Sequence, residues 1–278
     1  MTETLADMLT LVPGERADTF VGKSEPYGAI GIYGGHFLGQ ALAAAFGTVD
    51  EPKVANSFHA YFLKAGNPEL PIVYQVERLR DGRGFDTRVV KATQGEAPVF
   101  HMTASFKLPE DAAEEHQKVM PHVPSPEDVI AAREADGGEA GRFPMTLGGR
   151  VQMELISDHF VPQQFSPDRE PVLQSWMRVP GLENASQRMS QCALAYLADG
   201  TLMFNSVLPY GVPFRTHRLT SLDQSVWFHH PCDVSAWLMY DQRSILAADA
   251  RGLNEGEIYT EAGKVILTAA QESMLRKM

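Results

Sequence analysis

The sequence predicts an α+β fold built from two similar units, each a curved antiparallel sheet wrapped around a central helix. Three observations lead to this prediction. Two segments of helical character consist of small and apolar residues on almost every face, each is followed by four strand-like runs, and both sets keep the same order along the chain. With 278 residues, 44% of them hydrophobic, the chain can bury a large core.

The first helical segment, 31–49, contains no acidic or basic residue apart from one histidine. A helix that is apolar on every face is a buried helix. Gly34 and Gly35 are expected to open it, and Gly47 is expected to cap its C-terminal end.

Four strand-like runs follow, rich in Val, Phe, Tyr and Thr and bounded by turn residues. They cover 55–64, 71–80, 84–94 and 97–107. Asp81-Gly82 and Gly95 are typical of hairpin turns, so consecutive runs are expected to pair in an antiparallel sheet.

The next segment is acidic and polar, with Pro and Gly but little periodicity. We expect residues 1–108 to form the N-terminal unit and 172–278 the C-terminal unit. Residues 109–171 are then a linker with at most short helices, partly mobile in its middle.

The pattern returns after the linker. A second helical segment of small and apolar residues covers 187–199, and four strand-like runs cover 218–229, 236–246, 250–260 and 264–274. QALAAAFG resembles CALAYLAD, GRGFDTRVVKA resembles ARGLNEGEIYT, and APVFHMTASF resembles KVILTAAQES, in the same order. Such an internal repeat predicts two copies of one unit, each with a concave sheet covering its helix.

Several longer stretches carry a resemblance to a known family. They are GGHFLGQAL (34–42), NSFHAYFLKAG (56–66), LRDGRGFDTR (79–88), HMTASF (101–106), EEHQKVMP (114–121), LAYLAD (194–199), SLDQSVWFHHP (221–231), ARG (250–252) and AAQESMLR (269–276). These stretches are spread over nearly the whole chain. In them the chain resembles the type II, TesB-like acyl-CoA thioesterases. The resemblance implies the double hot-dog fold and hydrolysis of acyl-CoA to a free fatty acid and CoA.

The family's catalytic Asp, its Thr or Ser, and its Gln correspond here to Asp199, Ser221 and Gln271. Two departures stand out: Ser221 takes the place where several relatives have Thr, and Gly200-Thr201 follows Asp199 directly. Each residue also has a purely structural interpretation. Asp199 can end a helix, Ser221 can be an ordinary strand residue, and a buried Gln271 needs partners in any case.

The chemistry of these residue types fits thioester hydrolysis. A carboxylate can accept the proton of an attacking water, and a Ser hydroxyl and a Gln amide can both hold that water. Backbone N–H groups at Gly34-Gly35 can serve the oxyanion. A covalent role for Ser221 is not indicated, because no G-x-S-x-G motif surrounds it.

Other residues are candidates for substrate contact. Arg78, Arg83 and Arg88 lie in a run of basic residues that can receive the CoA phosphates, although a solvated hairpin face gives the same pattern. His59 is a candidate too, although a histidine among strand aromatics is also typical of a core position. His229-His230 is not expected to hold a metal ion, because adjacent strand residues face opposite sides.

Composition bounds the remaining possibilities. A net charge of −11 argues against nucleic acid and anionic membrane as partners, and no run approaches the roughly 20 apolar residues of a membrane helix. The N-terminus does not resemble a signal peptide, and two isolated cysteines suit a reducing compartment, so we expect a cytoplasmic protein. No cofactor or metal is expected, and a homo-oligomer, dimer or tetramer, is anticipated.

Two alternatives remain open from the sequence: an acyl-CoA dehydratase or hydratase of the same fold, and a non-catalytic acyl-CoA-binding protein. The first needs an Asp–His type pair, which neither helix offers near Asp199. The repeat also predicts only one productive site in each chain. Alignment of its two copies places Gly47 or Thr48 opposite Asp199, and Ser105 opposite Gln271.

Overall fold

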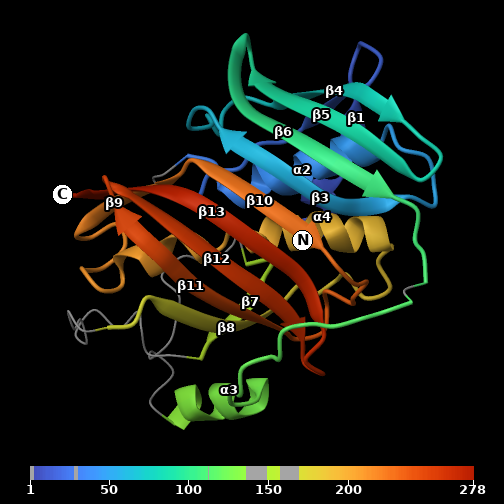
Figure 1. Ribbon diagram of the computed structural model, residues 1–278. Coiled ribbons are helices and arrows are strands. Elements are labelled where there is room, and N and C mark those ends of the chain that lie inside the picture. Colours follow the sequence, from blue (N-terminus) through green and yellow to red (C-terminus); the bar gives the residue numbers. More distant parts are fainter. Residues whose placement is uncertain (1–2, 28–30, 112, 136–148, 157–168) are drawn as a thin grey trace.

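The computed structural model describes residues 3–27, 31–111, 113–135, 149–156 and 169–278. Two helices, α2 (Gly34–Phe46) and α4 (Gln187–Ala198), contact each other beside a continuous sheet of 13 strands (Figure 1). The strand order is β1-β2-β4-β5-β6-β3-β10-β13-β12-β11-β8-β7, with β9 paired to β13. The predicted curved antiparallel sheets around two central helices are confirmed, and the two sheets join into one continuous sheet.

The N-terminal half follows the predicted order. Its strands β3 (Val54–Phe62), β4 (Ile72–Asp81), β5 (Phe85–Gln94) and β6 (Ala97–Lys107) agree with the predicted runs within a few residues. Three short elements were not predicted: α1 (Leu5–Leu9), β1 (Val12–Pro13) and β2 (Thr19–Gly22). β2 extends the sheet by pairing with β4, and α1 contacts both α2 and α4.

The C-terminal half repeats the arrangement around α4. Its strands are β8 (Val172–Arg178), β9 (His217–Ser221), β10 (Asp223–Phe228), β11 (Leu238–Ala248), β12 (Arg251–Thr260) and β13 (Val265–Lys277). The run predicted at 218–229 is divided into β9 and β10 at Leu222. There the backbone N–H of Leu222 donates to Glu272, and its carbonyl oxygen accepts from Phe62.

The two halves join through β3 and β10, which pair antiparallel from Asp223 opposite Tyr61 to Trp227 opposite Ser57. Equivalent strands of the two copies are therefore neighbours, and the halves are related by an approximate two-fold axis at this junction. The same relation places the start of α2 beside the end of α4, where Gly35 contacts Asp199.

The expected linker contains more structure than predicted. Helix α3 (Pro126–Ala135) and strand β7 (Gln152–Leu155) lie within 109–171, and β7 pairs with β8. Side chains along 120–130 pack on Trp176 and Trp237, so α3 covers the outer face of the C-terminal sheet. The division at 108 and 172 and the expected mobility stay predictions; much of the middle, 136–148 and 157–168, lies outside the described residues.

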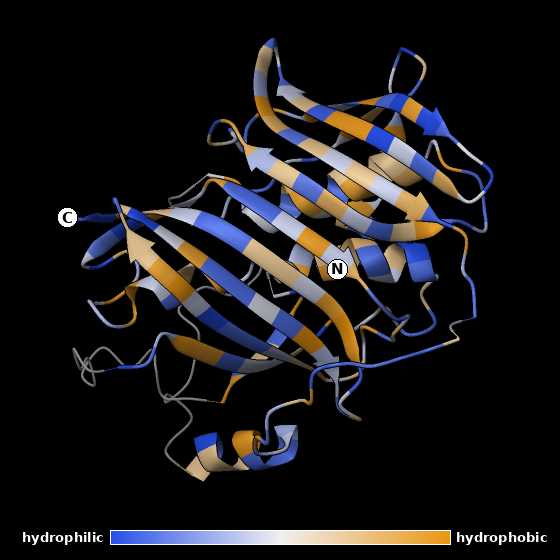
Figure 2. Ribbon diagram, in the orientation of Figure 1, coloured by the Kyte–Doolittle hydropathy of each residue, from blue (hydrophilic) through white to orange (hydrophobic). Residues whose placement is uncertain are grey.

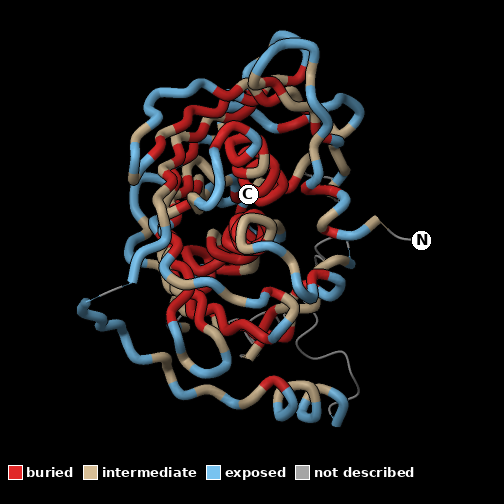
Figure 3. The backbone as a smooth tube through the Cα atoms, turned by 90° about the vertical axis from the view of Figure 1, so that its right-hand side faces the viewer, coloured by how far each residue is buried: buried red, intermediate tan, exposed pale blue. Residues whose placement is uncertain are grey.

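The core lies between the sheet and the two helices. Apolar and polar residues alternate along the strands (Figure 2), as expected for strands with one buried face. Figure 3 shows the buried backbone gathered in the central helices and the strands around them, with exposed turns at the periphery. Among the described residues, no helix is long and apolar enough to cross a membrane.

Candidate active site

The carboxylate of Asp199 lies at the end of α4, where Asp199 is the C-cap residue and only 2% exposed. Three groups donate hydrogen bonds to it. The backbone N–H of Gly35 donates to Oδ2 at 2.9 Å, Ser221 Oγ donates to Oδ1 at 3.1 Å, and Gln271 Nε2 donates to Oδ1 at 2.6 Å. The structure therefore brings together the three predicted catalytic residues.

Each partner of Asp199 comes from a different element. Gly35 belongs to the first turn of α2, Ser221 ends β9, and Gln271 lies in β13. Because Ser221 and Ser273 are paired in register, Gln271 lies two residues from the position opposite Ser221, on the same face of the sheet. Residues 22 to 164 positions from Asp199 in sequence thus meet at one carboxylate.

The close approach of the two helices requires glycine. A Cβ on Gly35 would lie 2.2 Å from the carbonyl oxygen of Tyr196, and a Cβ on Gly34 would lie 2.6 Å from Asp199 Oδ2. The N-terminus of α2 is the positive end of its dipole, so it also stabilises the negative charge of the carboxylate. The glycine pair is a structural requirement of the site.

The pKa of Asp199 is raised above its ordinary value of 3.8, and burial is the cause. The hydrogen bonds from Gln271, Ser221 and Gly35 act in the opposite direction, because they stabilise the ionised form. A buried carboxylate with a raised pKa is a stronger base than one in water, which suits the acceptance of a proton from a bound water molecule.

Gln224 is a further residue of the site, and the sequence did not single it out. It is fully buried in β10, and its Oε1 accepts a hydrogen bond from Gln271 Nε2 at 2.9 Å. This contact turns the amide nitrogen of Gln271 toward Asp199. Gln271 Oε1 and Gln224 Nε2 are buried and have no hydrogen-bond partner among the described residues. The alternation of buried residues along β10 is the only sequence signal for Gln224.

A cavity of about 300 Å³ opens beside the carboxylate, with Asp199, Gly34 and Ser221 in its wall. The rest of its wall is mostly apolar. Its larger apolar side chains are Tyr27, Ile32, Tyr33, Phe37, Phe62, Leu63, Met203, Phe204, Phe214, Leu219 and Leu222. A largely apolar cavity with a few polar groups at one point is the usual form of a site for an apolar ligand.

The two glycines have different roles in this geometry. The N–H of Gly35 is occupied by Asp199, so it is not the predicted oxyanion donor. Gly34 lines the cavity, and its N–H has no acceptor among the described residues. Asp199 Oδ2 receives one hydrogen bond and borders the space that the missing side chain of Gly34 leaves open.

His59 is not a core residue, and it does not line the cavity. It is exposed on β3, where its neighbours Phe58 and Ala60 face the core and His59 faces the opposite side. Its Nδ1 lies 2.9 Å from Ser225 Oγ, and its ring packs edge-on against Trp227. His59 thus lies on the outer face of the sheet, away from the carboxylate.

The arginines predicted to receive phosphates do not form one accessible group. Arg88 is 1% exposed, and Arg78 forms a two-pronged ion pair with Asp18 at 2.7 and 2.9 Å. Arg83 is exposed, and it lies in the turn next to Phe85, which is aligned with the start of β3. The cavity lies at the other end of β3. Nine residues of β3 separate the two ends by roughly 27 Å.

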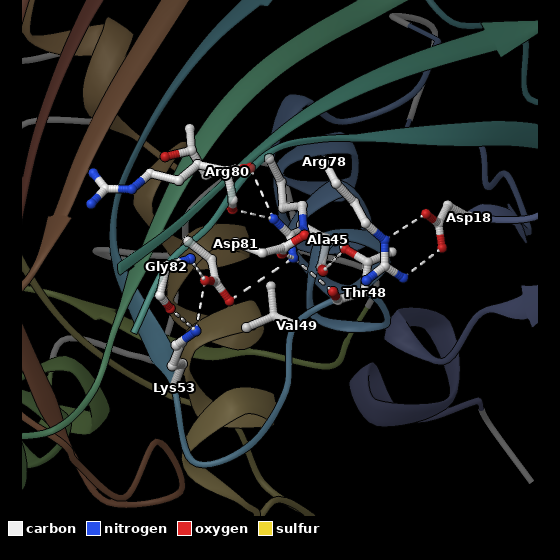
Figure 4. Close-up of polar contacts among 12 residues, drawn as sticks. Asp18, Ala45, Thr48, Val49, Lys53, Arg78, Arg80, Asp81 and Gly82 are labelled. Carbon is white, nitrogen blue, oxygen red and sulfur yellow. Dashed lines mark hydrogen bonds and ion pairs between the residues drawn. The ribbon is translucent and has the colours of Figure 1, made fainter. Parts of the chain in front are cut away.

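Arg88 fills the location related to Asp199 by the approximate two-fold axis. Gly47 caps α2 as Asp199 caps α4, and Thr48 is the next residue. The hydroxyl oxygen of Thr48 accepts a hydrogen bond from Arg88 Nε, and its carbonyl oxygen accepts one from Arg88 Nη2, both at 2.9 Å. Figure 4 shows the surroundings of Thr48. Lys53 and Asp86 complete this cluster with an ion pair of 2.6 Å. The second location is occupied by paired, buried charges.

The predicted counterpart of Gln271 was off by one residue. In the alignment of the two copies, Asp86 corresponds to Asn254. Asn254 pairs with Gln271 across the sheet, and Asp86 pairs with Phe106, so Phe106 and not Ser105 corresponds to Gln271. A shift of one residue reverses the face of a strand, and Phe106 is buried as Gln271 is. The second location therefore has no equivalent of the Asp199 carboxylate and none of the Gln271 amide.

Among the described residues, no group of three or more His, Cys, Asp and Glu side chains is arranged to hold a metal ion. His229 Nε2 lies 2.9 Å from Thr268 Oγ1. In the part of the chain that is described, no histidine forms a hydrogen bond with Asp199.

Comparison with known proteins gives a consistent picture. Two family models, described as the N-terminal and C-terminal domains of acyl-CoA thioesterases, match residues 23–107 and 126–275. Human acyl-coenzyme A thioesterase 8 is 34% identical over 271 residues, which cover 93% of this chain and 85% of that protein. Acyl-CoA thioesterase 2 of Haemophilus influenzae is 32% identical over 284 residues and covers 99% of both chains.

Solved structures agree with these sequence matches. The crystal structure of an acyl-CoA thioesterase II, TesB2, from Mycobacterium marinum has a TM-score of 0.80 and 29% identity, covering 98% of this chain and 96% of that one. The likeness extends to a protein described by its hot dog fold. The double hot-dog fold predicted from the sequence is confirmed.

Proposed function

This chain belongs to the acyl-CoA thioesterase family, and from that premise we propose that it hydrolyses acyl-CoA to a free fatty acid and CoA with a water molecule that Asp199 activates. One observation carries the proposal: the buried Asp199 carboxylate lies in the wall of an apolar cavity, held by Gly35, Ser221 and Gln271. The acyl chain occupies the cavity, which places the thioester carbonyl near the carboxylate.

The reaction begins with the attack of water on the thioester carbon. Asp199 accepts the proton that the water loses as the new C–O bond forms, and the carbonyl oxygen becomes an oxyanion. Collapse of this tetrahedral intermediate breaks the C–S bond. The departing CoA thiolate takes up a proton, which the protonated Asp199 can return, so the carboxylate is restored for the next turnover.

Ser221 and Gln271 are proposed to position the water and the carboxylate. Ser221 Oγ donates to Asp199 and accepts from Gln271 at 3.3 Å, so the three side chains form one network. Gln224 fixes the orientation of the Gln271 amide. The N–H of Gly34, which has no acceptor among the described residues, lies at the positive end of α2 and is the backbone donor that can reach an oxyanion in the cavity.

The direct test is a release assay. Purified protein is mixed with a panel of acyl-CoA thioesters of increasing chain length, and free CoA thiol is followed with a thiol reagent. The proposal expects catalytic release of CoA, with a preference set by the 300 Å³ cavity. A correctly folded protein that binds acyl-CoA without releasing CoA would instead be a binding protein, and the proposal would be wrong.

A further inference from the structure

A group of cations without carboxylate partners lies around β9 and the strand opposite it. Its members, which we call the β9 basic cluster, are Lys64, Arg215, Arg218, Arg276 and Lys277, all exposed. Within the described chain, none of them has a carboxylate oxygen within 4.0 Å. Some other exposed cations of this acidic protein, such as Arg78, do have such partners, whereas Arg80 and Arg83 of the β4–β5 hairpin have none among the described residues.

The strand register concentrates this charge. Arg218 and Arg276 are directly opposite each other in the antiparallel pair of β9 and β13, so their side chains leave the same face of the sheet. Like charges in that position destabilise a sheet. The neighbouring His217 faces inward. Its pKa is lowered first by burial and second by the positive charge of Lys277. An anionic ligand would relieve this repulsion.

The cluster adjoins the wall of the cavity. Thr220 lies two residues from Arg218 on the same face of β9, about 7 Å away, and it lines the cavity together with Lys64. Ser221 follows directly and holds Asp199. The β9 basic cluster therefore lies beside the part of the cavity wall that contains Thr220, Ser221 and Asp199.

We propose that the β9 basic cluster receives the phosphate groups of the CoA moiety. This proposal rests on the proposed function, since the CoA leaving group is what brings phosphates to the cavity. Guanidinium groups suit phosphate because they donate paired hydrogen bonds, and their attraction acts at the surface, where salt weakens it. This proposal takes the place of the expected phosphate contacts in the β4–β5 hairpin, where Arg88 is buried, Arg78 is paired with Asp18, and Arg83 is far from the cavity.

The test is a double charge reversal, Arg218→Glu with Arg276→Glu, in the full chain. KM and kcat are measured for an acyl-CoA and for the same acyl group on N-acetylcysteamine, a thioester without nucleotide or phosphate. At low salt we expect KM for acyl-CoA to rise about tenfold, equivalent to about 1.4 kcal/mol. The KM for the phosphate-free thioester and kcat should change little, and high salt should narrow the difference.

Three comparisons make the result decisive. Arg83→Glu changes the charge of another exposed arginine, at the end of β3 far from the cavity, and should leave both KM values unchanged. Arg218→Lys with Arg276→Lys should keep most of the affinity. Calorimetric titration with CoA alone gives the same ranking without turnover, so it tests the cluster even if the wild type releases no CoA. Equal loss for both thioesters, or no loss beyond that of Arg83→Glu, would overturn the proposal.

Discussion

Replacing Asp199 with Asn separates the chemistry of the carboxylate from its structural role. Asn keeps the shape of the side chain but cannot accept a proton. Loss of a general base costs about 10²–10⁴ in kcat, or about 2.7–5.4 kcal/mol of transition-state stabilisation. Binding of acyl-CoA should persist, because the apolar cavity is unchanged.

The structure indicates that this variant will fold. Asn can keep its oxygen toward the N–H of Gly35 and turn its amide toward Ser221 and Gln271. The Gln271 amide can then turn its Oε1, which accepts no hydrogen bond from the described part of the chain, toward the new donor. One rearranged hydrogen bond is worth about 1 kcal/mol, and burial of a charge is removed at the same time, so Tm should change by less than about 5 °C.

Steady-state release of CoA is the assay, with thermal unfolding as the check on the fold. The pH dependence adds a second readout. Activity requires the ionised carboxylate, so kcat/KM should fall as pH decreases through the raised pKa of Asp199, with a midpoint above 3.8. A folded Asp199→Asn protein that keeps more than about a tenth of wild-type kcat would refute the general-base role.

Three further outcomes are expected. Gln224→Leu should lower kcat about tenfold with little change in KM, because the acceptor that orients Gln271 is lost. Gln224→Glu should restore part of the rate. An unchanged kcat in Gln224→Leu would show that Gln224 has only a structural role. Gly34→Ala should lose activity but fold, whereas Gly35→Ala should lose stability because its Cβ meets backbone, as circular dichroism and CoA release can show together; a fully active Gly34→Ala would contradict the cavity geometry. Arg88→Met should cost about 3–5 kcal/mol in denaturant unfolding and leave kcat of the folded protein unchanged, unless the second location is catalytic.

The sequence predicted most of the fold because the buried elements carry strong local patterns. The segments that form α2 and α4 consist mostly of small and apolar residues, and the eight repeated runs form strands with one apolar face. Both patterns can be recognised directly in the sequence. The short elements escaped prediction for a physical reason. α1 and β2 have five and four residues, and they are stable only through contacts with α2, α4 and β4 that lie far away in the sequence.

The site was predicted through its resemblance to a family, and its geometry shows where local patterns fail. Asp199, Ser221 and Gln271 meet as that resemblance implied. Arg88 illustrates the opposite case. It stands in an exposed-looking basic run, but the alternation of β5 turns its side chain inward toward Thr48. A charge in a hairpin cannot be assigned to a face until the strand register is known.

The most direct test of the central claim is a single-turnover experiment with the wild-type protein in excess over acyl-CoA. Samples are quenched rapidly, CoA and free acid are quantified separately, and the protein mass is determined at each time. Attack by an Asp199-activated water predicts that CoA and acid appear at the same rate, with no acyl group on the protein. A burst of CoA ahead of the acid, with an acylated protein accumulating in between, would contradict it.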